Sequence, residues 1–130
     1  MICSIQAVNG YVHLKVSGKV EIEPLLVRLE TAIMVCCGRK APKLLIDLWE
    51  VEGVPTETHK AMGGLTMVRL YSKYCPFPPS QFVVAVLGVQ SNATTLQLQD
   101  APGIDEMKRA GLQVVHTYNR DEALSYLAKI

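Results

Sequence analysis

Hydroxyl, imidazole and carboxylate groups gather between residues 47 and 59 of the chain. Thr56, Thr58 and His59 stand within about one helical turn of one another. A hydroxyl beside an imidazole is the pair that nucleophilic catalysis uses, but it also needs a group that orients the base and donors that hold an oxyanion. The sequence shows neither near His59. We therefore expect His59 to be a polar helix residue, and we predict no catalytic site.

The carboxylates of the same segment are Asp47, Glu50, Glu52 and Glu57. Carboxylates can bind a metal ion or work as an acid pair, but their spacing here matches no calcium or zinc pattern. This spacing favours a solvated acidic loop. We predict no bound metal.

Cysteine thiols are a further source of redox or metal chemistry. The chain has Cys3, Cys36, Cys37 and Cys75. No CxxC spacing occurs among them, and adjacent cysteines cannot easily pair with each other. We expect reduced cysteines packed as small apolar side chains, as in cytoplasmic proteins. Glycine-rich phosphate-binding motifs and the GxSxG motif are also missing, so we predict no cofactor.

Composition narrows the class of protein further. The chain has 130 residues, a length that suits one domain over 1–130. Its net charge of +1 predicts no binding to nucleic acid. Charges or prolines interrupt every apolar run, and the first ten residues do not resemble a secretion signal, so we expect a cytoplasmic protein without a membrane span. With 49% hydrophobic and 19% charged residues, the surface is expected to be slightly apolar, which predicts a homodimer.

Strands and helices alternate along the chain and must position these residues. Asn9-Gly10 predicts a type I′ turn between two strands. The predicted strands are 2–8, 11–17, 43–48, 81–88 and 112–118. The predicted helices are 23–37, 56–74, a short one that opens near Pro102 and ends at Gly111, and a last one capped by Asn119. The segment 89–99 has mixed character.

This order of elements predicts an α/β fold. We expect a single layered domain with a mostly parallel five-stranded sheet, an N-terminal β-hairpin at its edge and four helices. The strand 43–48 is apolar throughout, so it is expected to be central, with a polar loop following from Trp49. The strand 11–17 alternates, and we expect His13 on its polar face, toward solvent or a neighbouring layer.

The helix 56–74 carries the residues of greatest interest. Thr56 can serve as its N-cap, because a threonine hydroxyl satisfies a free backbone N–H at a helix start. One stripe of the helix is expected to hold Ala61, Leu65, Val68 and Ser72, with Met62 and Tyr71 at its margin. Gly63-Gly64 should cost about 1 kcal/mol each relative to alanine, which predicts a close approach of the backbone to the sheet or to a second helix.

The order of elements and three short segments of the chain resemble a known family. The strand Leu44-Leu45-Ile46-Asp47-Leu48 and the closing segments 111–115 and 121–127 are similar to STAS-type domains, the anti-sigma-factor antagonists and their relatives with SEC14-like folds. Small bacterial stand-alone members, many of unknown function, resemble this chain most. The resemblance implies a STAS-like α/β fold and a regulatory protein-interaction role.

The resemblance also implies a phosphoacceptor. In phosphorylated antagonists a serine follows the strand-ending aspartate by nine residues, and Thr56 holds the matching position in this chain. The neighbours differ, because Pro55 precedes Thr56 where the antagonists have aspartate, and Glu57-Thr58-His59 follows it in place of Ser-Gly-Leu. A phosphate there would lie at a positive helix end, while the simpler alternative is that Thr56 is only a cap.

Two functional classes follow from these observations. The first is a non-catalytic interaction module whose partner binds along Trp49, Glu52, Thr56, Thr58, His59 and Met62, with Thr56 as the possible phosphoacceptor. The alternative is a binder of a small apolar ligand or lipid, as the SEC14-like relationship implies. The residues expected to line such a cavity are Trp49, Met62, Gly63, Gly64, Met67 and Phe77. A cavity above about 300 Å³ would favour the ligand class, and a filled core would favour the interaction module.

Overall fold

The strands predicted from the sequence form one sheet. The structure is a computed structural model that describes residues 1–8, 10–38, 43–53, 56–76, 78–90 and 102–128. In this part of the chain the strands are β1 (Ile2–Val8), β2 (Tyr11–Lys19), β3 (Lys43–Glu52), β4 (Val83–Leu87) and β5 (Gln113–Thr117). They lie in the order β1-β2-β3-β4-β5, with β1 antiparallel to β2 and every later pair parallel.

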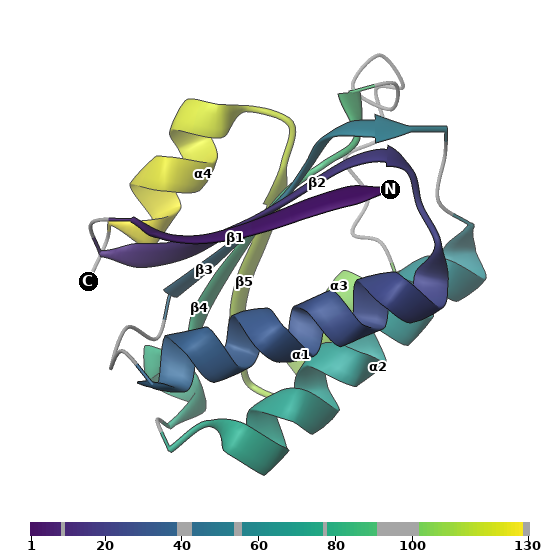
Figure 1. Ribbon diagram of the computed structural model, residues 1–130. Helices are drawn as coiled ribbons and strands as arrows, with labels where there is room; N and C mark the ends of the chain where they lie inside the picture. Colours follow the sequence, from purple (N-terminus) through teal and green to yellow (C-terminus); the bar gives the residue numbers. More distant parts are fainter. Residues whose placement is uncertain (9, 39–42, 54–55, 77, 91–101, 129–130) are drawn as a thin grey trace.

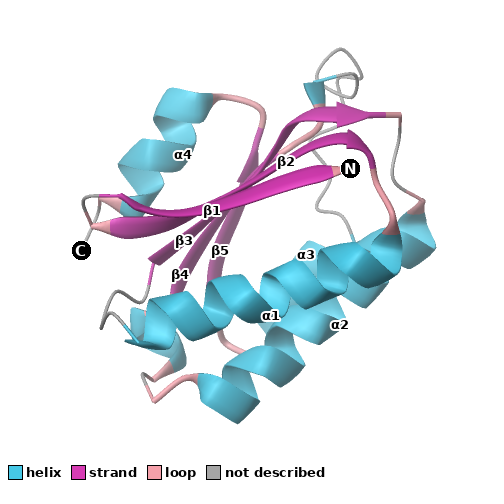
Figure 2. Cartoon of the chain, viewed as in Figure 1, coloured by secondary structure: helices cyan, strands magenta, loops and turns pink. Residues whose placement is uncertain are grey.

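Helices cover both faces of this sheet. They are α1 (Ile22–Gly38), α2 (Glu57–Tyr74), α3 (Pro102–Arg109) and α4 (Arg120–Leu127), with a short 3₁₀ turn, η1, at Pro79–Gln81. Helices α1, α2 and α3 lie on one side of the sheet and α4 lies on the other (Figure 1). Figure 2 shows the same layers with the helices in cyan and the strands in magenta. The α/β order, the hairpin and the four helices agree with the prediction.

The two faces of the sheet build two separate cores. Side chains alternate along a strand, so Val84 and Val86 of β4 pack under α1, α2 and α3, while Val83, Ala85 and Leu87 pack under α4. The larger core lies on the three-helix side. The central strands are therefore apolar on both faces, which explains their continuous apolar sequences.

The hairpin prediction is confirmed at its described residues. Val8 pairs with Tyr11, which leaves two residues for the turn, and Gly10 has φ of +87° as a type I′ turn requires. Asn9, the other turn residue, lies outside the described part of the chain. So do Pro55, Phe77 and most of the segment 89–99.

Strand β3 is longer than the sequence predicted. The polar loop expected from Trp49 is wrong, because β3 continues to Glu52 and pairs with the end of β2 through Ser17↔Glu50, Gly18↔Val51 and Lys19↔Glu52. The register shifts between Lys15 and Ser17, and this irregularity lets the two strands remain paired beyond the apolar run. Glu50 also pairs with Lys15 at 3.0 Å.

The buried face of α2 does not coincide with the predicted stripe. Its buried residues are Gly64, Thr66, Met67 and Leu70, whereas Leu65 of that stripe is 54% exposed. The reason is a helix–helix contact: a Cβ on Gly64 would lie 2.6 Å from the carbonyl carbon of Gly103 in α3. The close approach predicted for Gly63-Gly64 is thus confirmed for Gly64, with a second helix. Gly63 meets nothing within 4 Å.

Candidate functional site

The N-terminus of α2 is the centre of the candidate site. Thr56 is exposed and is the N-cap of the helix: its Oγ1 accepts a hydrogen bond of 3.1 Å from the backbone N–H of His59. The cap predicted for Thr56 is therefore confirmed. Glu57 follows in the first turn, where a negative side chain complements the positive end of the helix dipole.

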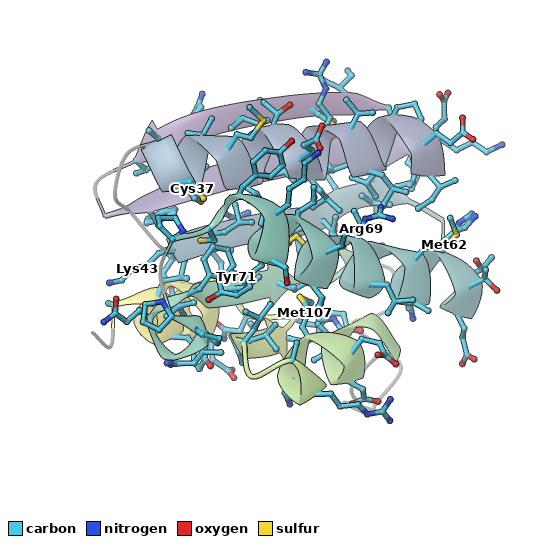
Figure 3. The ribbon with its side chains drawn as sticks, turned by 90° about the horizontal axis from the view of Figure 1, so that it is seen from below. Cys37, Lys43, Met62, Arg69, Tyr71 and Met107 are labelled. Carbon is cyan, nitrogen blue, oxygen red and sulfur yellow. The ribbon has the colours of Figure 1, made fainter. Side chains whose placement is uncertain are left out.

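An exposed stripe of mixed character follows along α2. Its members recur at helical spacing and are Thr58, Met62, Leu65 and Arg69, and we call them the α2 stripe. Met62 is 39% exposed and Leu65 is 54% exposed. Figure 3 shows Met62 and Arg69 on the side of α2 that is turned toward α1. Two large apolar side chains left in water beside a charged one are typical of a protein-binding surface.

His59 points the other way. It is half-buried and lines a cavity of about 130 Å³ between the sheet and helices α1, α2 and α3. The predicted cavity residues Gly63, Gly64 and Met67 also line it, while Trp49 and Met62 are not among its described lining residues. The volume is below the range of about 300–1,000 Å³ that drug-sized ligands occupy.

Trp49 and Glu52 lie apart from the α2 stripe. Trp49 is half-buried and packs against the smaller core, on the side of the sheet that α4 covers. Glu52 is exposed at the end of β3. Of the predicted site residues, the structure thus groups Thr56, Thr58 and Met62 on one exposed surface, places His59 beneath them and sets Trp49 on the opposite face.

A buried carboxylate forms a second polar cluster on the α4 side. Asp47 is 1% exposed, so its expected place in a solvated loop is wrong. Its Oδ2 accepts hydrogen bonds of 3.0 Å from His13 Nε2 and from Arg120, and its Oδ1 accepts one of 3.1 Å from the Trp49 amide. Burial alone would raise the pKa of Asp47, but these three hydrogen bonds outweigh it and lower the pKa to about 2.

This cluster joins β2, β3 and the first turn of α4. His13 lies on the predicted polar face of its strand and meets the α4 layer there. The signal that could have revealed the cluster is the lone aspartate within an apolar strand, since a buried charge is found paired. Its partners are 34 and 73 residues away, so sequence spacing could not identify them.

Metal binding and membrane spanning are two further properties on which the described residues bear. No group of three or more His, Cys, Asp or Glu side chains there is placed to hold a metal ion. Within the same residues, no helix has the length and apolar character needed to cross a membrane.

Comparison with known proteins gives a likeness of fold. No protein-family model and no curated protein matches the sequence. Among solved structures, the chain is similar to an anti-sigma factor antagonist from Mycobacterium paratuberculosis, with a TM-score of 0.60 and 19% identity over 98% of this chain and 94% of that one. At this identity the likeness shows the fold, and the predicted STAS-like α/β fold is confirmed.

Proposed function

We propose, from the fold that this chain shares with an anti-sigma factor antagonist, that it is a non-catalytic regulatory module that binds a protein partner. The observation that carries the proposal is the α2 stripe, which begins two residues after the exposed cap Thr56 and leaves Met62 and Leu65 in water. A partner that buried these two side chains would gain apolar contact at the centre of its interface.

Phosphorylation of Thr56 is the proposed control of this binding. The hydroxyl is exposed, and backbone N–H groups at the helix start can hold a phosphate. A phosphate adds a charge of about −1.5 to −2 beside Glu57 and the apolar part of the stripe, so a partner would have to desolvate that charge in order to dock. We infer that the phosphorylated form releases its partner.

The non-catalytic part of the proposal also has structural support. A hydrolase that used His59 would need a pocket joining the imidazole to a hydroxyl and an acid. The described lining of the cavity beside His59 contains His116 and Tyr118 but no carboxylate.

Quantitative affinity capture from the cells that make the protein tests the partner surface. The wild-type chain is compared with Leu65→Asp and with a matched control, Val27→Asp, which changes another exposed apolar side chain, 62% exposed on α1. We expect a protein that the wild type and the control retain and that Leu65→Asp loses. Equal retention by all three chains would contradict the proposed surface.

A homodimer through the edge strand is a further part of the proposal. Strand β1 carries seven residues without a charge or a proline, and Ile2 is 74% exposed. Uncharged edge strands of this length readily pair with another strand, and two copies of β1 could pair antiparallel. Light scattering on a sizing column should give a dimer for the wild type and a monomer for Ser4→Pro, and a wild-type monomer would contradict this part.

We also propose that the chain acts as one domain in the cytoplasm, without binding nucleic acid. Four free cysteines suit a reducing compartment, and the net charge of +1 offers no basic field for nucleic acid.

Binding of a small apolar ligand is the second candidate function, and the cavity beside His59 favours it. Its volume of about 130 Å³ is too small for the lipid that a SEC14-like relationship would suggest. The ligand of this candidate is therefore a small molecule.

A further inference from the structure

The cavity beneath α2 lies where an α/β sheet is best placed to bind a ligand. Its walls include Ile46 of β3, Val86 of β4 and His116 of β5, together with the first turns of α2 and α3. Ligands of open α/β sheets bind at the carboxyl ends of parallel strands, and the lining residues place this cavity at that end.

The chemistry of the walls is almost entirely apolar. Leu29, Met67, Ile104 and Met107 line it, and each is at most 5% exposed. Figure 3 shows Met107 between α2 and α3, and the adaptable side chains of two methionines help such a site to fit its guest. The cavity volume of about 130 Å³ is several times the roughly 30 Å³ that one water molecule occupies in the liquid.

An aromatic wall closes one side of the cavity. The rings of His116 and Tyr118 are 5.1 Å apart between centroids and inclined at 55°. Aromatic rings prefer such tilted or offset arrangements, so a third ring can pack against this pair. His59 of α2 is a further lining residue of the cavity.

We propose that this cavity binds a small apolar molecule with a single aromatic ring, of about six to eight non-hydrogen atoms. An apolar cavity of about 150 Å³ in another protein stays free of water and takes up benzene, which sets this size. The inference rests on the second candidate function, and it does not depend on partner binding at the α2 stripe. The inner side of α2 faces the ligand and its outer side carries the stripe.

Titration of the full chain with benzene, followed by methyl-resolved NMR, tests the proposal. We expect saturable shifts confined to lining methyl groups such as those of Ile104 and Met107. Val86→Phe fills the cavity and should weaken benzene binding at least about tenfold. Val115→Phe makes the same change on the α4 side of the sheet, where Val115 is half-buried, and should leave the affinity within about twofold.

A second variant keeps the test decisive if Val86→Phe fails to fold. Leu25→Ala enlarges the cavity at a half-buried position, so naphthalene should then bind more tightly relative to benzene than it does to the wild type. Absence of saturable shifts, or equal benzene affinity in the two phenylalanine variants, would overturn the proposal. Either outcome leaves the capture experiment with Leu65→Asp unaffected, so failure of the two proposals can be told apart.

Discussion

Adding one methyl group at Gly64 should destabilise the fold, while the same change at Gly63 should stabilise it. A Cβ on Gly64 would lie 2.6 Å from the carbonyl carbon of Gly103, and still nearer to its Cα and oxygen. Carbon atoms pack at about 3.5–4.0 Å, so α2 and α3 would have to separate by roughly 1 Å. The obstacle is backbone, which cannot rotate away as a side chain can.

The magnitudes follow from two opposing effects. Alanine in place of glycine gains about 1 kcal/mol of helix propensity at either position. Overpacking lowers the free energy of unfolding by about 1–3 kcal/mol, and a clash with backbone lies at the upper end of that range. After the gain in helix propensity is subtracted, Gly64→Ala should lower the free energy of unfolding by about 2 kcal/mol. Gly63 meets nothing within 4 Å, so Gly63→Ala should keep the full gain.

Urea unfolding of the two variants measures the difference. With an m-value of about 2 kcal/mol/M, the midpoint should fall by about 1 M for Gly64→Ala and rise by about 0.5 M for Gly63→Ala. A midpoint for Gly64→Ala at or above that of the wild type would refute the helix–helix contact as the reason for the orientation of α2. Equal losses in both variants would refute it as well.

Three further predictions concern single side chains. The pKa of Asp47 is lowered from 3.8 to about 2 in the folded protein. The ionised side chain therefore adds about 2 kcal/mol to the free energy of unfolding above about pH 4, and this contribution is lost as the pH falls toward 2. Asp47→Asn should flatten that part of a stability–pH curve, and an unchanged curve would contradict the cluster. Thr56→Ala should lower the free energy of unfolding by about 1 kcal/mol, while Thr56→Ser should keep the cap and the wild-type stability. Equal melting temperatures for the two variants would contradict the role of Thr56 as the N-cap. Burial, with Cys37 and Cys75 nearby, raises the pKa of Cys36 to about 12, so iodoacetamide at pH 8 should modify Cys36 only after unfolding.

Local chemistry predicted the elements of this fold well. The hairpin followed from Asn9-Gly10, because few residues adopt positive φ, and the caps at Thr56 and Asn119 followed from side chains that accept a backbone N–H three residues on. The alternation of strands and helices then restricted the sheet to a mostly parallel one. Each of these signals lies within a few residues of the chain.

Long-range contacts decided what the sequence did not predict. The rotation of α2 about its axis depends on the contact between Gly64 and Gly103, which lies 39 positions later in the chain. Because successive residues of a helix point about 100° apart, burying Gly64 turns Leu65 toward solvent. Asp47 is buried because His13 and Arg120 reach it from β2 and α4. Thr58 and Met62 of the α2 stripe were predicted from the sequence, but Leu65 and Arg69 joined them only once the tertiary structure fixed the rotation of the helix.

Mass spectrometry tests most directly whether phosphorylation of Thr56 controls partner binding. The protein is purified from its own cells and separated into partner-bound and free fractions. If Thr56 controls partner binding at the α2 stripe, a phosphate should map to Thr56 in the free fraction and be depleted from the bound fraction. Equal phosphate occupancy at Thr56 in both fractions, or no phosphate on Thr56 in either, would contradict the switch.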